Sequence, residues 1–125
     1  MNGSPRQGSQ TLSWKERLHK RRDFLRSYSQ GKRIYTATLV TYFLQNKLDR
    51  PRLGVTVSRK IGKAATRNRI KRRIRELFRT TKSAGAPGFD IVVNVRKAAA
   101  RASFTTLQKD YLKALGRIER NTERS

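Results

Sequence analysis

Apolar side chains recur with different periods along the chain, and each period predicts a different kind of element. Phe24 and Tyr28 stand four residues apart, and Gly31 occupies the position of a helix C-terminal cap, so we predict a short helix over 21–28. Residues 34–46 carry no charge and are rich in β-branched and aromatic types. That composition predicts a strand.

The strand over 34–46 and the segment after it are typical of a hairpin. Alternation within the first strand places Ile34 on the same face as Tyr42. Residues 47–51 indicate a turn, after which residues 52–58 alternate polar and apolar side chains as a second strand. We therefore expect these two strands to pair with each other.

The second half of the chain predicts helix, strand and helix. Apolar residues recur at helical spacing over 67–79, with Thr66 placed as N-cap, and a Gly- and Pro-containing loop follows at 83–88. A strand over 89–95 is apolar enough to be covered on both faces, and a last helix is predicted over 103–118. The predicted element order is αββαβα, in a mixed α and β fold.

Length and the two polar ends predict one domain. A chain of 125 residues has the size of a single domain. Residues 1–13 are rich in Gly, Ser, Gln and Pro without apolar periodicity, so we expect a flexible tail there. The apolar stripe ends at Ile118, so residues 119–125 are expected to fray. The folded domain is predicted over 14–118.

The charge of the chain indicates a polyanionic partner. The 31 Lys and Arg residues exceed the 8 Asp and Glu residues by 23, and such self-repulsion must be offset. No apolar run is long enough for a membrane span or a secretory signal, so we expect a cytoplasmic protein that binds no membrane.

Few residues could carry chemistry. Cys is absent and His19 is the only histidine, which argues against thiolate zinc sites and against Cys- or His-based catalysis. The eight acids show no paired spacing for acid/base work, and each has a surface-charge or capping explanation. We therefore predict no catalytic and no metal-binding residue in this chain.

The densest positive charge lies in residues 59–79, which hold ten basic residues and one acid, Glu76. A helical wheel places Asn68, Lys71, Arg72, Arg75 and Arg79 away from the apolar stripe of Ile70, Ile74, Leu77 and Phe78. Like charges four residues apart repel unless an anion neutralises them, so nucleic acid is favoured over a merely solvated helix face. Arg predominates over Lys, which favours bidentate phosphate contacts. RNA is preferred to DNA, although composition alone leaves both open.

Aromatic residues on the first helix and first strand form a weaker signal. Consecutive packing would bring Phe24, Tyr28 and Tyr42 together, with Tyr35 as a further candidate. A basic cleft with an aromatic floor suits unstacked bases of single-stranded RNA. Ordinary core packing explains the same spacing and is the more frequent outcome. The pattern alone leaves both interpretations open.

The string RNRIKRRIR at 67–75 resembles the signature of the bacterial ribonuclease P protein subunit. RLHKRRDF at 17–24, the segment 52–79 and GFDIVVNVRKAA at 88–99 resemble other parts of that family, so the similarity covers about 17–118. The motif is specific in combination, because the family pattern is also met by Ser58, Arg59, Lys60, Gly62 and Asn68.

The resemblance implies an α+β fold, a single-domain αββαβα two-layer sandwich with a left-handed βαβ crossover, against the usual handedness. It implies a ribonucleoprotein endonuclease that hydrolyses a phosphodiester to remove the 5′ leader of precursor tRNA. In that family the catalytic centre belongs to an RNA subunit with Mg²⁺ bound mainly by the RNA, and the protein holds the leader. Ribonuclease P RNA and precursor tRNA are thus the expected partners, and no protein partner is expected.

The family's functional positions can be carried over residue by residue. Those that would contact the catalytic RNA subunit are Arg67, Asn68, Arg69, Lys71, Arg72 and Arg75. Those that would line or border the leader-binding cleft are Phe24, Tyr28, Tyr42, Ser58 and Lys60.

Two other functions use the same basic helix. A structural ribosomal or rRNA-chaperone protein would need the helix without a substrate cleft. A DNA-binding protein with 67–79 as recognition helix is less favoured, because a strand and the loop RKIGKAAT precede it instead of a first helix and a tight turn.

Overall fold

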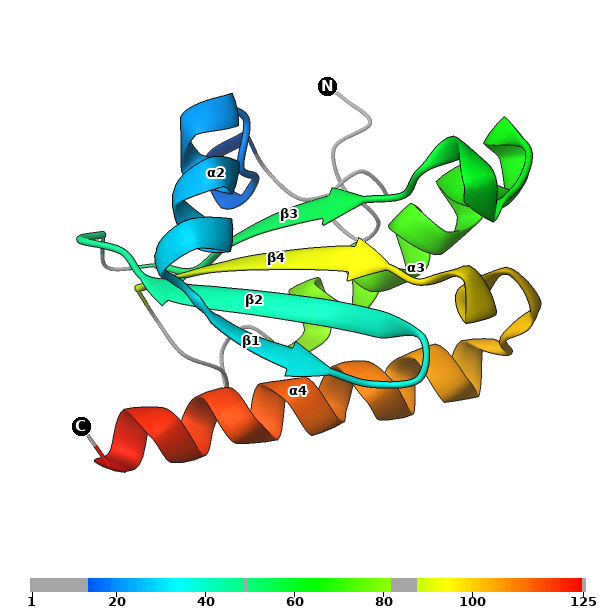
Figure 1. Ribbon diagram of the computed structural model, residues 1–125. Coiled ribbons are helices and arrows are strands. Elements are labelled where there is room, and N and C mark those ends of the chain that lie inside the picture. Colours follow the sequence, from blue (N-terminus) through cyan, green and yellow to red (C-terminus); the bar gives the residue numbers. More distant parts are fainter. Residues whose placement is uncertain (1–13, 49, 82–87, 125) are drawn as a thin grey trace, which may run out of the picture.

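The computed structural model describes residues 14–48, 50–81 and 88–124 (Figure 1). Four strands and three α-helices make up most of this part of the chain, with three short 3₁₀ helices between them. In chain order the elements are η1 (Trp14–Glu16), α2 (Arg21–Gln30), β1 (Lys32–Tyr35), β2 (Leu39–Gln45), β3 (Arg52–Thr56), η2 (Arg59–Ile61), α3 (Ala64–Thr81), β4 (Phe89–Val95), η3 (Lys97–Arg101) and α4 (Phe104–Arg124).

The strands form one sheet in the order β1-β2-β4-β3. β2 pairs antiparallel with both β1 and β4, whereas β3 and β4 are parallel. α3 connects these two parallel strands by passing behind the sheet in Figure 1, and the crossover is left-handed. The predicted α+β class and its unusual crossover are confirmed.

One face of the sheet carries the apolar core. Alternate strand residues point to this face, and α3 and α4 pack against it, so the core includes Leu39, Phe43, Leu53, Ile91, Val93, Ile70, Ile74, Phe78, Leu107, Tyr111 and Ile118. Ile74 of α3 and Ala114 of α4 have no exposed surface. The apolar stripes predicted for the two helices are therefore the buried ones.

α2 lies on the opposite face of the sheet (Figure 1). Its C-terminal cap is Gly31, as predicted, and the Gly31 N–H donates to the Ser27 carbonyl at 2.9 Å. Gly54 of β3 allows α2 to lie close, because a Cβ there would stand 2.6 Å from two ring carbons of Phe24. The Phe24 ring of α2 therefore lies directly against the backbone of β3 at Gly54.

The prediction of one strand over 34–46 is wrong, because this segment forms β1, a tight turn and β2. Thr36 closes the turn by donating its backbone N–H to the Leu39 carbonyl at 2.9 Å, and the Thr38 N–H donates to Asp110 of α4 at 3.0 Å. The turn reverses the alternation, so Ile34 pairs with Thr41 and is buried instead of sharing a face with Tyr42. The hydrogen bond to Asp110 joins residues that are 72 positions apart, so the pattern of residues 34–46 does not reveal the turn.

The predicted hairpin between 34–46 and 52–58 is also wrong. β4 lies between β2 and β3, so these two neighbours in sequence never pair. A turn signal fixes where the chain reverses and does not fix the partner of a strand. β4 takes the central place because its Ile91, Val92 and Val93 are buried on both faces, as its continuous apolar run predicted.

Helix ends differ from the predicted ones. α3 begins at Ala64, so Thr66 lies in its first turn and is not the N-cap. α4 continues to Arg124, through most of the segment 119–125 that we expected to fray. The predicted tail over 1–13 and most of the loop at 83–88 lie outside the described residues. No helix in the described part of the chain is long and apolar enough to cross a membrane.

Candidate nucleic-acid interface

α3 separates a buried stripe from a charged surface. Ile70, Ile74, Leu77 and Phe78 are at most 3% exposed and face the sheet. Asn68, Arg69 and Arg72 are exposed, and the other three predicted contacts, Arg67, Lys71 and Arg75, are half-buried. The structure therefore brings all six residues predicted to bind the RNA subunit onto one helix, outside the core.

The start of α3 is held to the loop before it. The Arg67 guanidinium donates from Nε to the Gly62 carbonyl at 3.2 Å. Gly62 has φ 155°, a backbone conformation that other residues rarely adopt, which explains the glycine between Ile61 and Lys63. The backbone of this loop thus positions the first arginine of the charged surface.

Arg17 adds to the charge beside α3. Burial lowers the pKa of Arg75, and the nearby positive charge of Arg17 lowers that pKa further. The Nε of Arg17 is itself buried without a hydrogen-bond partner. Mutual repulsion between these two positive charges favours an anionic partner. Arg17 was missed in the sequence because it stands far from the basic helix.

Two other arginines of α3 are engaged inside the protein. Arg79 pairs with Glu76 at 2.6 Å, and the Arg73 guanidinium lies 5.6 Å from the ring centre of Phe104 on α4. These contacts strengthen the helix and its packing on α4. The residues available to a ligand are therefore concentrated in the first three turns of α3.

The structure brings Phe24, Tyr28 and Tyr42 together on the sheet face that α2 covers. The rings of Tyr28 and Tyr42 meet edge to face, with 4.8 Å between their centres, and Phe24 packs at Gly54. All three side chains are half-buried. The rings are thus fixed by protein contacts and still reach the surface.

Two polar residues connect the aromatic group to β3. The Tyr28 hydroxyl donates to the side-chain oxygen of Asn94 at 3.0 Å, and the Thr56 hydroxyl donates to the same oxygen. Ser58 and Lys60 follow Thr56 and are exposed at the end of β3. Asn94 and Thr56 were missed, although an asparagine inside an otherwise apolar strand is a usable signal.

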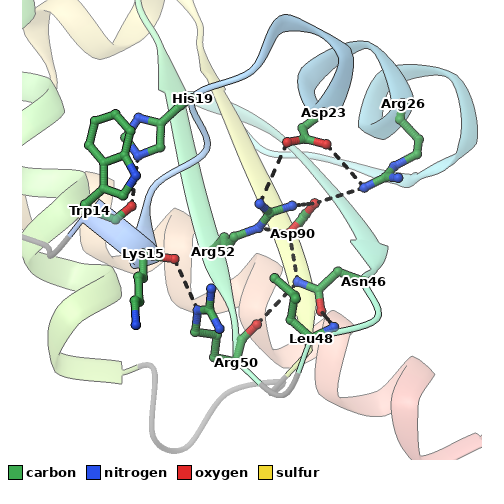
Figure 2. Close-up of polar contacts among 10 residues, drawn as sticks. All are labelled: Trp14, Lys15, His19, Asp23, Arg26, Asn46, Leu48, Arg50, Arg52 and Asp90. Atoms are coloured by element: carbon green, nitrogen blue, oxygen red, sulfur yellow. Dashed lines mark hydrogen bonds and ion pairs between the residues drawn. The ribbon is translucent and has the colours of Figure 1, made fainter.

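A buried ion-pair network fastens α2 to the sheet (Figure 2). Asp90 of β4 has no exposed surface and accepts two hydrogen bonds from Arg52 of β3, at 2.9 and 2.8 Å, and one from Asn46 at 2.8 Å. Arg26 and Asp23 of α2 complete the network, with Arg26 lying 3.7 Å from Asp90 and Arg52 lying 3.7 Å from Asp23. The hydrogen bond that Arg52 donates to Asp90 raises the pKa of Arg52 against the opposing effect of burial.

Three of the acids contradict the prediction that each acid has a surface-charge or capping role. Asp23, Asp90 and Asp110 are at most 8% exposed, and each carboxylate contacts a specific partner in another element. Periodicity does not reveal such pairs, because the partners are far apart in sequence. Within the described residues, His, Asp and Glu form no group of three that could hold a metal ion.

The fold and this surface define a class: a small α+β nucleic-acid-binding protein with a basic helix on one side of its sheet and a group of half-buried aromatic rings on the other. A family model described as Ribonuclease P matches residues 12–119. The chain therefore belongs to the ribonuclease P protein family, whose role is the removal of 5′ leaders from precursor tRNA.

Individual relatives agree with this assignment. The ribonuclease P protein component of Thermotoga maritima is 43% identical over 115 residues, which cover 89% of this chain and 98% of the relative. That of Syntrophus aciditrophicus is 49% identical over 66% of this chain and 70% of the relative.

Solved structures agree as well. The ribonuclease P protein structure from Thermotoga maritima has a TM-score of 0.76 at 44% identity, covering 82% of this chain and 97% of that chain. The Staphylococcus aureus protein has a TM-score of 0.75 at 37% identity, covering 83% and 94%. The function is therefore ribonuclease P action in tRNA processing, and the ribosomal or rRNA-chaperone alternative is not supported.

Proposed function

We propose that this chain is the protein subunit of a ribonuclease P holoenzyme whose catalytic centre, with its Mg²⁺ ions, lies in the RNA subunit. The protein's own carboxylates support this division, because Asp23 and Asp90 are engaged by Arg52 and Arg26. When bound to the RNA, Mg²⁺ would activate the attacking water and stabilise the leaving oxygen. The protein binds and orients both RNAs.

The charged surface of α3 binds the RNA subunit in this proposal. Arg67, Asn68, Arg69, Lys71, Arg72 and Arg75 contact its phosphates and unpaired bases. The separation of faces on α3 supports this, because the core fixes the helix through Ile74 while Arg69 and Arg72 remain exposed. Arg17, whose positive charge lowers the pKa of Arg75, extends the same surface. Forming phosphate contacts releases counterions, so assembly depends steeply on salt.

The 5′ leader of precursor tRNA binds along the aromatic group. Leader bases stack on Phe24, Tyr28 and Tyr42, and Ser58 and Lys60 contact the backbone at the end of β3. Stacking tolerates any base, because every base has a flat π-face, and this suits leaders of varied sequence. Asn94 acts as a positioning residue by fixing the Tyr28 ring through its hydroxyl.

The observation that carries the proposal is the fixed but partly exposed position of the Tyr28 and Tyr42 rings. They are locked edge to face at 4.8 Å and yet remain half-buried on a sheet face that α2 covers only in part. Rings needed only for stability would be expected in the core with Tyr111, which is 2% exposed.

Reconstitution tests this function. Adding the chain to its cognate RNA subunit at low Mg²⁺ should restore leader cleavage, because the protein's positive charge and leader contacts replace part of the role of the metal ions. An Arg69→Gln/Arg72→Gln variant should need more protein for the same rate. A Lys109→Gln/Lys113→Gln variant, with the same charge change on exposed positions of α4, should not. Cleavage by protein alone, or no stimulation by the wild-type chain, would refute the proposal.

A further inference from the structure

A concave surface lies along α2, on the flank opposite the one that carries Phe24 and Tyr28. It is a pocket of about 810 Å³ between η1, α2, the end of β2 and the residues that follow it. Leu18 anchors its wall, because its N–H donates to the Leu53 carbonyl at 2.9 Å. The Arg50 Nε donates to the Lys15 carbonyl at 3.3 Å across the same wall (Figure 2).

The lining of this pocket is strongly basic. Of the sixteen described residues that line it, eight are Lys or Arg and one, Asp23, is acidic. Arg26 and Arg52 form the ion pairs with Asp23 and Asp90, and these pairs do not use Lys20, Arg22 or Lys47. Those three side chains are exposed. A concave surface lined by one sign of charge concentrates ions of the opposite sign.

An exposed aromatic stack borders the pocket. The rings of Trp14 and His19 are parallel within 16°, with 3.5 Å between their centres, while Trp14 is 74% exposed (Figure 2). The Nε2 of His19 lies 2.8 Å from the Trp14 carbonyl, so this nitrogen carries the proton and donates it. An indole fixed on one face and open to solvent offers a stacking platform for a planar ligand.

We propose that this pocket is a second RNA site, in which the cations of the pocket bind phosphodiesters of a single strand and Trp14 stacks on one of its bases. RNA as the ligand class rests on the proposed function. Phosphodiester charge matches the lining, and a base matches the exposed indole. The strand is either the part of the leader that extends beyond the aromatic group or a single-stranded part of the RNA subunit.

α2 divides the two sites. Phe24 and Tyr28 are on the flank that meets Gly54 and Tyr42, whereas Arg22, Arg26 and Gln30 line the pocket on the other. Residues four apart lie along one side of a helix, so the two sets lie on different sides of α2. One helix therefore presents an aromatic flank to one RNA segment and a basic flank to another.

The fluorescence of Trp14 reports on the pocket directly, because the chain has one Trp. The probe is an oligouridylate of about ten nucleotides, within the usual size of a single-stranded site. It should quench Trp14 in the wild-type chain and equally in a Tyr28→Ala/Tyr42→Ala variant. A Lys20→Gln/Arg22→Gln/Lys47→Gln variant should bind about ten-fold more weakly, and its log–log salt slope should fall by about two, since each phosphate contact contributes about 0.7.

The matched control is Arg101→Gln/Lys109→Gln/Lys113→Gln, which removes three exposed cations on η3 and α4. Equal losses in the two triple variants, or unchanged quenching in the pocket variant, would overturn the proposal. Repeating the titration with the RNA subunit and with long-leader precursor tRNA distinguishes the two sources of the strand. Absence of low-Mg²⁺ stimulation by the wild-type chain would instead refute the proposed function, whatever Trp14 reports.

Discussion

The two faces of the sheet are built from the same strands and covered in opposite ways. On one face, Ile91 and Val93 of β4 meet apolar side chains of α3 and α4 and are at most 2% exposed. On the other face, the same strand presents Asp90 and Asn94, which bond to polar groups of β3 and α2. Of the three α-helices in the described part of the chain, α2 is the one that covers this second face, and the aromatic rings beside it stay half-buried.

This difference shows how a small chain combines a core with a binding surface. A strand alternates its side chains, so each residue that stabilises one face is followed by one free to serve the other. The apolar face supplies stability, and the polar face holds α2 in place with ion pairs. None of the seven Lys and Arg residues of α3 is fully buried, because the helix turns its apolar stripe toward the core.

The largest effect is expected on the polar face, from Asp90→Asn. The substitution removes the nearer and doubly hydrogen-bonded carboxylate from the Arg52 guanidinium, which is 18% exposed, and leaves it only the ion pair with Asp23 at 3.7 Å. Losing one member of a buried pair typically costs about 3–5 kcal/mol of unfolding free energy, which urea denaturation would measure. Glu76→Gln, which breaks a more exposed pair on α3, should cost under about 1 kcal/mol. Equal costs would show that the polar face does not depend on this pair.

On the apolar face, ionisation of Tyr111 should lower the unfolding free energy at high pH. Burial raises its pKa from 10.0 to about 12, opposed by a hydrogen bond with Thr81, so the folded chain keeps a proton that the unfolded chain has lost. Stability from this group is complete below pH 10 and is lost as the pH rises to 12. The loss should reach about 2–3 kcal/mol, at about 1.4 kcal/mol per pH unit.

Tyr111→Phe is the control for this titration. It lacks the hydroxyl, so the difference in unfolding free energy between variant and wild type should change in favour of the variant from pH 10 to 12. The other ionisable groups titrate alike in both chains and cancel. A difference independent of pH would contradict the buried, neutral phenol.

The contact between α2 and the sheet is tested by Gly54→Ala. The new Cβ would stand 2.6 Å from two Phe24 ring carbons, so the ring must move. Overpacking of this kind costs about 1–3 kcal/mol, and the cost should be smaller when Phe24 is already Leu. Thermal unfolding of the four chains of this cycle measures the coupling. An equal cost in both backgrounds would show that Phe24 does not limit how closely α2 lies.

The smallest expected effect is that of Arg69→Ala on assembly with the RNA subunit. Arg69 is exposed, so folding should not change. The slope of log affinity against log salt should fall by about one, because one phosphate contact is lost. Lys113→Ala on α4 is the matched control. An unchanged slope for Arg69→Ala would place the RNA subunit elsewhere.

Local patterns predicted the helices and their buried stripes well, because helical periodicity is a property of neighbouring residues. They failed where contacts between residues distant in sequence determine the structure. The turn between β1 and β2 depends on Asp110, and the position of β4 between β2 and β3 depends on packing of the whole sheet. The grouping of Phe24, Tyr28 and Tyr42 on one sheet face could be predicted from helix and strand positions.

The polar partners of the site could not be predicted in the same way. Asn94, Thr56 and Arg17 reach it only through the tertiary fold. The buried pair of Arg52 and Asp90 shows the same limit, since 38 residues separate its members. Charge patterns predict where a chain is basic, and they do not reveal which of its few acids are buried.

The central claim is that the charged surface of α3 and the aromatic group bind two different RNAs. The most direct test is the ratio of dissociation constants for leaderless and leader-containing precursor tRNA, measured with the holoenzyme. Phe24→Ala should reduce this ratio by the equivalent of about 1–3 kcal/mol, the usual value of one stacked base. Tyr35→Ala, which removes an exposed aromatic ring outside the group, should preserve the ratio, as should Arg69→Gln/Arg72→Gln once its holoenzyme is assembled. An unchanged ratio with Phe24→Ala, or a collapse with Arg69→Gln/Arg72→Gln, would contradict the account.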